Sequence, residues 1–168
     1  MTSKLFQPIE LRGLTLANRI VVAPMCQYSA KEGAATDWHM IHLGALALSG
    51  AGLAIAEATA GEPRGRITPD CLGIWSDETE AAAARVVAAC HEQGVTPLGI
   101  QIGHAGRKAS AHAPQRGGGP LDAASGAWET IAPSAIPFDE GWHTPRAMDR
   151  ADMDRVIAGL VDATERSA

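Results

Sequence analysis

Three short apolar runs, separated by longer segments of helical character, set the pattern of this chain. Residues 19–25 contain a β-branched run too short for a helix, and Pro24, which has no N–H to donate, ends it. Residues 53–59 and 97–103 are apolar runs of similar length with few polar positions, as expected for strands covered on both faces. The pattern therefore predicts three strands.

Helical spacing of apolar residues appears between and after these runs. It predicts helices over about 38–49, 78–93 and 150–166. A capping side chain precedes or opens each of them: Thr36 or Asp37, then Asp77, then Asp149. The alternation of strands and helices predicts an α/β fold with a parallel sheet and right-handed crossovers.

Two further segments complete the chain. Residues 5–18 have apolar positions on both sides of Arg12-Gly13, which predicts a short hairpin that leads into the first strand. Residues 109–147 form the longest irregular stretch and contain a Gly-Gly-Gly-Pro sequence and four other prolines. Loops longer than ~15 residues inside a compact domain are usually functional lids or flexible segments.

Side chains that can react or hydrogen-bond follow the first and third predicted strands. Cys26, Gln27 and Tyr28 come directly after the first. His104, Arg107 and Lys108 come after the third. Parallel α/β folds present their sites at the carboxyl edge of the strands, so these clusters are candidates for a site. A buried strand followed by an ordinary loop is the simpler alternative.

Composition excludes several function classes. The 168 residues are 46% hydrophobic and 20% charged, with a net charge of −5, which fits a globular domain rather than a disordered chain. Without a basic stripe, nucleic acid is not an expected partner, and no apolar run approaches the ~20 residues of a membrane helix. The N-terminus lacks the apolar core of a signal peptide. Three widely spaced cysteines (Cys26, Cys71, Cys90) indicate reduced thiols and a cytoplasmic location.

A series of short motifs runs along the chain from Leu5 to about residue 165. In order they are Leu-Phe-Gln-Pro-Ile, Leu-Ala-Asn-Arg-Ile, Ala-Pro-Met-Cys-Gln-Tyr, Asp-Trp-His, Glu-Ala-Thr-Ala, Gly-Arg-Ile-Thr, Gly-Ile-Trp-Ser-Asp, Ile-Gln-Ile-Gly-His-Ala-Gly-Arg-Lys and Ala-Pro-Ser-Ala-Ile. With these motifs in this order, the chain resembles the Old Yellow Enzyme family of FMN-dependent ene-reductases, in its bacterial thermophilic-like (YqjM-like) class.

The resemblance implies the N-terminal part of one (β/α)₈ TIM barrel, incomplete on its own because such a barrel takes ~250 residues. Within 1–168 it implies a hairpin lid at 5–18, the first βαβαβ units at 19–108, the long loop at 109–147 and the third helix at 149–166. The family's His-x-x-His-Gly-Tyr segment, which binds the substrate carbonyl and supplies a proton, is expected beyond residue 168. No catalytic residue is therefore expected in this chain.

The implied activity is transfer of a hydride from NADPH or NADH, through FMN, to the β-carbon of an alkene activated by a carbonyl or nitro group. It requires the C-terminal remainder of the barrel as a partner, from the same gene or a separate chain. A homo-oligomer is expected when the barrel is complete. Two alternatives stay open. One is a non-catalytic fragment that acts only in association, and the other is a related flavin barrel acting on dienoyl-CoA or amines.

The resemblance also implies roles for individual residues. It assigns Cys26 as a flavin redox modulator and Tyr28 to substrate binding, where a rim tyrosine is the simpler alternative. A small side chain at Ala58 leaves room for the flavin, and the Gln101 amide offers the pyrimidine edge a donor and an acceptor. The full set of expected cofactor-binding residues is Ala23, Pro24, Met25, Cys26, Ala58 and Gln101.

Other polar residues receive structural interpretations. His39 and His42 stand three apart on one predicted helix, a spacing that suits a metal, but a third ligand is not evident, so packing of a hydrogen-bonded imidazole is favoured. Glu57 is expected to hydrogen-bond within the barrel. Cys71 and Cys90 are expected to be structural.

Overall fold

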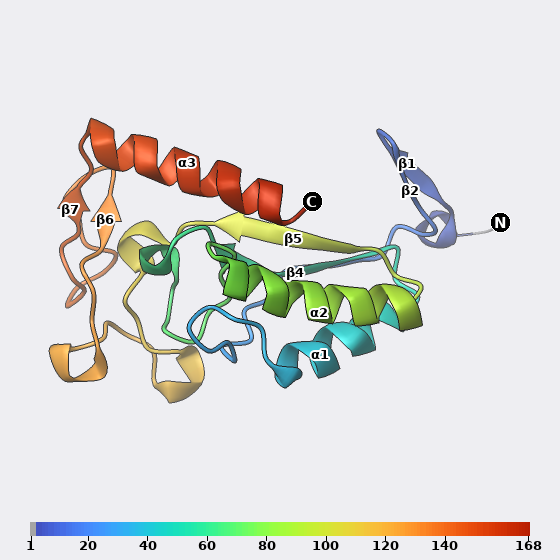
Figure 1. The fold of residues 1–168 in the computed structure, drawn as a ribbon, viewed down its shortest axis with the longest axis horizontal. Helices are drawn as coiled ribbons and strands as arrows, with labels where there is room; N and C mark the ends of the chain where they lie inside the picture. The colour runs from blue at the N-terminus through green and yellow to red at the C-terminus, as the bar shows by residue number, and fades with distance from the viewer. Residues whose placement is uncertain (1–2) are drawn as a thin grey trace.

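A hairpin at the amino end stands apart from the main sheet in the computed structural model, which describes residues 3–168 (Figure 1). Its strands are β1 (Ile9–Leu11) and β2 (Leu14–Leu16), paired antiparallel. The turn between them places Arg12 in the left-handed region, with φ 55°. The Arg19 N–H donates to the Leu5 carbonyl at 2.9 Å and ties the hairpin segment to the chain entering the sheet.

The main sheet has three parallel strands in the order β3-β4-β5. Their bounds are Val21–Val22, Leu53–Ala60 and Leu98–Gly103. The first strand was predicted over 19–25, but only two of its residues pair with β4. Pro24 accounts for the early end, because it cannot donate to the ladder.

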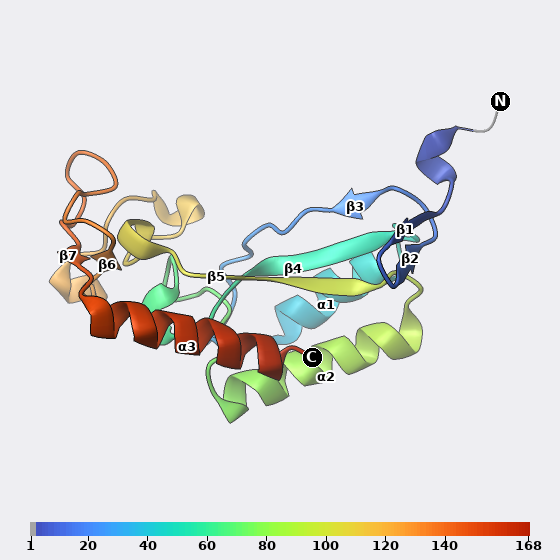
Figure 2. The same ribbon diagram turned by 90° about the horizontal axis from the view of Figure 1, so that it is seen from above.

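Helices α1 (Asp37–Ala47) and α2 (Asp77–Gln93) lie side by side against the sheet (Figures 1 and 2). Their shared core is built from Leu43, Ala47, Val86 and Cys90, with Ala56 of β4 packed against it. This core fixes which face of β4 is turned toward the helices.

Capping of α2 differs from the prediction. Asp77 was expected to cap this helix, but it is the first helical residue, and Ser76 is the cap. The Ser76 backbone is extended and its hydroxyl accepts a hydrogen bond from the Thr79 N–H at 3.4 Å. Asp77 instead adds negative charge to the first turn, where the helix dipole favours it.

Helix α3 (Arg150–Arg166) runs along β5 and begins at its predicted cap, Asp149, which accepts from the Asp152 N–H at 2.8 Å. Its approach to the loop after β4 depends on two glycines. A Cβ on Gly61 would lie 2.7 Å from the carbonyl oxygen of Gly159, closer than carbon and oxygen approach. No helix within residues 3–168 is long and apolar enough to cross a membrane.

The stretch 109–147, predicted to be irregular, contains a small parallel ladder between β6 (Ile131–Ala132) and β7 (Arg146–Ala147). The Arg146 side chain, which binds Asp152 at the start of α3, anchors the second of these strands. Short 3-10 helices also occur in the chain, at Lys4–Phe6, Pro63–Gly65, Gly106–Lys108, Pro114–Arg116 and Ala123–Ser125.

Candidate functional site

A β-bulge in β4 determines how the site is built. Ala56 pairs with Ile100 and Ala58 pairs with Gln101, so Glu57 is an extra residue with no opposite position on β5. A bulge changes the alternation of side chains along a strand. Ala56 and Glu57 therefore both turn toward the helices, and Ala58 turns to the other side of the sheet.

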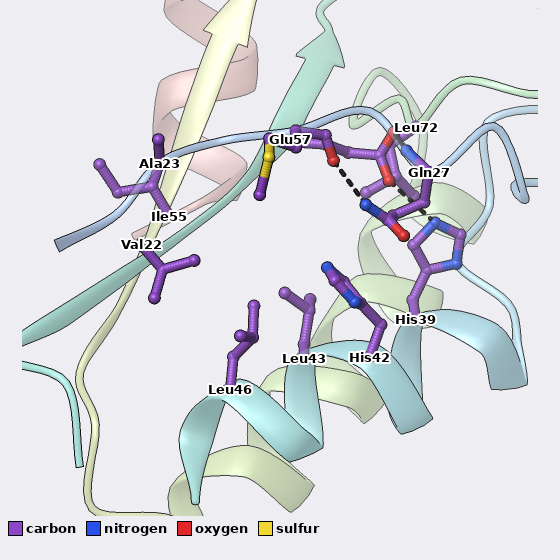
Figure 3. A pocket seen from close by; sticks show the side chains of 11 residues that line it. Val22, Ala23, Gln27, His39, His42, Leu43, Leu46, Ile55, Glu57 and Leu72 are labelled. Atoms are coloured by element: carbon purple, nitrogen blue, oxygen red, sulfur yellow. Dashed lines mark hydrogen bonds and ion pairs between the residues drawn. The ribbon is translucent and has the colours of Figure 1, made fainter. Parts of the chain in front are cut away.

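Glu57 is buried and joins β4 to the loop after β3 and to α1 (Figure 3). One carboxylate oxygen accepts a hydrogen bond from the Gln27 N–H at 3.0 Å. The other lies 3.3 Å from Nε2 of His39, which is also buried. The Thr36 N–H donates to His39 Nδ1 at 3.0 Å, so the neutral ring carries its proton on Nε2, facing Glu57. We call Thr36, His39, Glu57 and Gln27 the Glu57 cluster.

The Glu57 cluster holds the loop that carries the predicted site residues. Next to it, between β3, β4 and α1, is a cavity of about 10 Å³, which is about the volume that one water molecule needs (Figure 3). Gln27 continues the network: its amide donates to the Met25 carbonyl at 2.8 Å and accepts from the Trp38 indole at 3.2 Å. The cavity is too small for a cofactor, so the Glu57 cluster positions the loop rather than holding a ligand.

The Cys26 thiol is the centre of a second group, on the loop between β3 and α1. The Cys71 thiol, the Ala58 N–H and the Tyr28 hydroxyl are the groups that interact with it electrostatically. Tyr28 itself has a left-handed backbone, with φ 51°, which costs free energy for a residue with a side chain. That conformation is held in place on the loop that the Glu57 cluster secures.

The two thiols shift each other's pKa in opposite directions. The hydrogen bond to Cys71, together with burial, raises the pKa of Cys26 well above its usual range. The same hydrogen bond, aided by the hydroxyl and N–H of Thr68 at 3.4 Å, lowers the pKa of Cys71 to about 7. Burial, ahead of the charge at Cys26, raises the pKa of Tyr28. A proton lost from this pair near neutral pH therefore leaves its charge on Cys71.

The residues predicted to bind the cofactor come from three neighbouring strands. Ala58 and Gln101 are paired across β4 and β5, and residues directly paired in a sheet point to the same face. We call this the open face, the side of the sheet opposite α1 and α2. Gln101 is exposed on the open face. Cys26 lies beside this face, where its thiol interacts with the Ala58 N–H. Ala23 and Met25, just past β3, are also exposed, and Pro24 between them is half-buried.

Other predicted residues lie elsewhere. His39 packs within the Glu57 cluster and His42 lines the small cavity. Across residues 3–168, no three side chains of His, Cys, Asp or Glu come together in a way that would hold a metal ion. Cys90 belongs to the core between α1 and α2. Glu57 was expected to hydrogen-bond within the barrel; its carboxylate accepts from the Gln27 N–H and faces α1, because the bulge turns it to the helix side of the sheet.

Sequence reasoning missed two features near the site. One is the Cys26–Cys71 contact, although both cysteines follow parallel strands and loops after such strands meet at one edge. The other is Arg66, whose guanidinium lies 5.3 Å from the ring centre of Trp75 and 5.6 Å from that of Trp128. Of the residues predicted as a cluster after the third strand, His104 is paired with Glu62, with 2.9 Å between imidazole and carboxylate.

Comparison with known proteins agrees with this architecture. Residues 4–168 match the NADH:flavin oxidoreductase / NADH oxidase family. A curated relative, the NADPH dehydrogenase of Geobacillus thermodenitrificans, is 41% identical over 169 residues, which are 99% of this chain and 45% of that enzyme. The chain therefore spans less than half the length of this relative.

Solved structures give the same picture. Morphinone reductase in complex with tetrahydroNAD has a TM-score of 0.79 and 27% identity, covering 98% of this chain and 46% of that one. Old Yellow Enzyme from Pichia sp. AKU4542 has the same TM-score at 24% identity, a likeness in fold, covering 97% of this chain and 42% of that one. The hairpin, three parallel strands and three helices are thus the N-terminal part of a (β/α)₈ barrel, and the chain belongs to the NADH:flavin oxidoreductase / NADH oxidase family.

Proposed function

We propose that this chain is the flavin-holding N-terminal part of an NAD(P)H-dependent ene-reductase. The observation that carries the proposal is the pairing of Ala58 and Gln101 on the open face, with Cys26 beside them on the loop after β3. The Geobacillus relative is an NADPH dehydrogenase, and the morphinone reductase structure is a complex with tetrahydroNAD; both support a nicotinamide reductant.

The residues of the open face fit FMN. The exposed Gln101 amide offers one donor and one acceptor to a ring edge that carries both. Its neighbour Ala58 carries only a methyl group, so a flat ring can approach the strand closely. The backbone at Ala23, Pro24 and Met25 leaves the β-ladder after Val22, so the carbonyls of Ala23 and Pro24 take no part in the ladder and can face a ligand. When bound, FMN supplies the hydride chemistry between NADPH or NADH and the alkene.

The residues of this chain then bind the flavin and orient it and the substrate. Gln101 fixes the pyrimidine edge, and the Cys26 thiol, a weak hydrogen-bond donor, adjusts the polarity beside the ring. Tyr28, hydrogen-bonded to Cys26, borders the space where an alkene carrying a carbonyl or nitro group would lie. Proton delivery is assigned to the histidine pair expected outside this chain, so no residue here is proposed as a catalytic acid.

The remainder of the barrel is the proposed partner. Among the described residues, β3 and β5 each pair on one side only, and Ile157 and Val161 of α3 expose apolar side chains. Further βα units would cover both the free sheet edges and this apolar helix face. We propose that the completed enzyme forms a homo-oligomer and acts in the cytoplasm, where the three free cysteines stay reduced.

FMN binding is the direct test. We expect the purified chain, incubated with FMN, to carry flavin absorbance through gel filtration. Gln101→Leu should weaken FMN binding roughly tenfold, because two hydrogen bonds of about 1 kcal/mol or less each are lost. Gln93→Leu, an exposed glutamine at the end of α2, is the matched control and should bind as the parent does.

Two results would contradict the proposal at different points. If Gln101→Leu binds FMN as tightly as the parent chain, the pyrimidine edge does not lie on Gln101. If no flavin co-elutes even after incubation with excess FMN, these three strands do not hold the cofactor, and the chain is a non-catalytic associating piece.

A further inference from the structure

A groove beside the loop after β4 is lined by none of the residues proposed to bind FMN. Its volume is about 530 Å³, which lies in the range of about 300–1,000 Å³ that small-molecule sites occupy. Its walls come from parts of segment 62–66 after β4, parts of segment 126–129 in the long loop, and Arg155 of α3. We call it the Arg66 groove, after the arginine in its wall.

Arg66 is held in one place by the fold. Its Nε and Nη1 donate to the carbonyl oxygens of Pro63 and Pro69, each at 2.9 Å. The guanidinium also lies 5.3 Å from the ring centre of Trp75 and 5.6 Å from that of Trp128. A flexible arginine loses rotamer freedom when it binds a ligand. Because the fold has already removed that freedom from Arg66, the side chain is preorganised for binding.

Two of the three arginines of the groove keep a positive charge without a close carboxylate. Arg66 has neutral carbonyl partners, and no carboxylate oxygen within residues 3–168 lies within 4.0 Å of its guanidinium. Arg64 is 4.0 Å from Glu62, a separation at which an ion pair is weak. Arg155, by contrast, is paired with Asp152 at 2.9 Å and with Glu62 at 3.3 Å. Arg64 and Arg66 are therefore the groups that can bind an anion.

Trp128 and Glu129 add other kinds of contact. The Trp128 N–H donates to the Ser110 hydroxyl at 3.0 Å, and its indole N–H donates to the Arg64 carbonyl at 3.1 Å, so the ring is fixed in the groove wall. A tryptophan ring can stack on the flat face of any base. The Glu129 carboxylate is 60% exposed and can accept hydrogen bonds from hydroxyl groups.

From this combination of charge, ring and acceptor we propose that the Arg66 groove binds a nucleoside phosphate. The phosphate binds Arg64 and Arg66, because guanidinium groups match the geometry of phosphate oxygens. The base packs on Trp128, and the ribose hydroxyls donate to Glu129. A free nucleotide and the nucleotide end of the reductant present the same groups, so both are sources of this ligand.

The groove lies away from the apolar face of α3. Arg155 and Ile157 are two positions apart on this helix, which places them about 200° apart around its axis. The rest of the barrel is proposed to cover the face that carries Ile157 and Val161. Covering that face therefore does not require the Arg66 groove to be filled.

Binding of AMP to the 168-residue chain, measured without flavin, tests the proposal. Isothermal titration calorimetry should show one AMP bound per chain. Adenosine and inorganic phosphate should each bind at least tenfold more weakly, because each makes only part of the contacts. If AMP does not bind, or if adenosine or inorganic phosphate binds as tightly as AMP, the groove is not a nucleoside-phosphate site.

Arg64→Gln separates the phosphate contact from the base contact. It should weaken AMP binding roughly tenfold and leave adenosine binding unchanged, because it removes one charged donor. The Arg64 side chain is 37% exposed, and the carbonyl at this position still accepts from Trp128, so the wall stays in place. Arg116→Gln, at an exposed arginine outside the groove, is the matched control and should bind AMP as the parent does. An equal loss in both variants would mean that only net charge attracts the ligand.

Trp128→Leu tests the base contact. It should weaken AMP and adenosine binding by a similar factor, about tenfold, because base stacking is lost, and it should leave inorganic phosphate binding unchanged. Trp128→Phe keeps a ring, disturbs the packing less and should retain most of the AMP affinity. If the two variants bind AMP equally well, or if Trp128→Leu does not fold and Trp128→Phe binds as the parent does only in the presence of Arg64→Gln, the base does not rest on this ring.

FMN also carries a phosphate, so crossed measurements separate the two sites. Arg64→Gln should leave FMN binding unchanged, and Gln101→Leu should leave AMP binding unchanged. Weaker FMN binding in Arg64→Gln would make the groove part of the flavin site and overturn this inference alone. AMP binding by a chain that does not bind FMN would refute only the proposed function.

Competition with NADPH identifies the source of the ligand. If NADPH displaces AMP from the parent chain, and displaces it more weakly from Arg64→Gln, the groove holds the nucleotide end of the reductant. If AMP stays bound at saturating NADPH, the groove holds a free nucleotide.

Discussion

Two buried carboxylates, Glu57 and Asp152, each fasten a loop to a helix, but they do so with different partners. Both are 4% exposed. Glu57 faces the Gln27 N–H and the His39 ring, which is itself buried. Asp152 faces two guanidinium groups, on Arg146 and Arg155, whose side chains are 41% and 43% exposed.

The difference shows that the solvent exposure of the binding partners determines which groups bind a buried carboxylate. Where the partners reach water, charged arginines can serve, because they remain partly solvated and their ion pairs are screened. Where the partners are enclosed, a charged group would bring a large desolvation penalty, and a peptide N–H and a neutral imidazole take its place. The enclosed cluster is the one that positions the candidate site, so breaking it should have the larger effect.

The largest effect is expected from Glu57→Ala. It leaves the Gln27 N–H without its acceptor and removes the carboxylate that lies 3.3 Å from the buried His39 Nε2, which should lower the free energy of unfolding by about 2–4 kcal/mol. Urea unfolding of the chain measures this change. Glu10→Ala, on the exposed hairpin, is the control and should stay within about 0.5 kcal/mol of the parent. Equal effects at the two positions would mean that the Glu57 cluster does not hold the loop.

A somewhat smaller effect is expected from His39→Ala. It removes the acceptor of the Thr36 N–H at the start of α1 and opens space in the core, at a cost of about 2 kcal/mol. His42→Ala, three residues along the same helix, should cost less because His42 is only half-buried. A larger loss at His42, or a rise in stability of the parent chain when Zn²⁺ is added, would instead favour the metal interpretation of this pair.

The smallest effect is expected from Asp152→Asn, and it should depend on pH. The Arg146 guanidinium, followed by that of Arg155, holds the pKa of Asp152 well below its usual range. A depressed carboxyl pKa stabilises the fold fully above the unfolded-state value of about 3.9, and that stabilisation is lost as pH falls through the folded-state pKa. The parent and Asp152→Asn should therefore differ by a constant amount at about pH 6–8 and converge in acid.

Salt sharpens the same comparison. Added salt should narrow the difference between the parent and Asp152→Asn, because the arginines are exposed and their ion pairs are screened. The Glu57→Ala difference should hardly change, because Glu57 and His39 are both buried and the hydrogen bond from Gln27 comes from a neutral N–H. Parallel salt curves for the two variants would show that exposure of the partners does not separate the two clusters.

Local pattern predicts the elements of this fold well and their junctions poorly. The apolar runs locate β4 and β5, and the capped periodicity of α3 places that helix at residues 150–166. By contrast, the β6–β7 ladder joins two-residue strands whose partners are separated by fifteen positions. Pairing of that kind depends on tertiary placement, and no local periodicity marks it.

The site shows the same division. Motifs locate Cys26, Tyr28 and Gln101, and the strand order explains why Ala58 and Gln101 lie side by side. The partners that hold them were not predictable. Nothing in the residues around Glu57 marks a bulge, so its direction toward α1 was not foreseen. The contact of Cys71 with Cys26 likewise depends on how two distant loops pack together, which spacing along the chain does not encode.

The bulge also limits how this half-barrel can be recombined with a foreign one. From Ala56 to Ala58 the strand β4 advances two residues while β5 advances one, from Ile100 to Gln101. A chimera whose donor strand lacks the extra residue would keep the equivalent of Ala58 opposite Gln101, but it would lose the carboxylate that binds the Gln27 N–H and faces His39. Crossover points that preserve the anchor of the loop after β3 must therefore lie before Ala56 or after Ala60, with the intervening segment transferred as one unit.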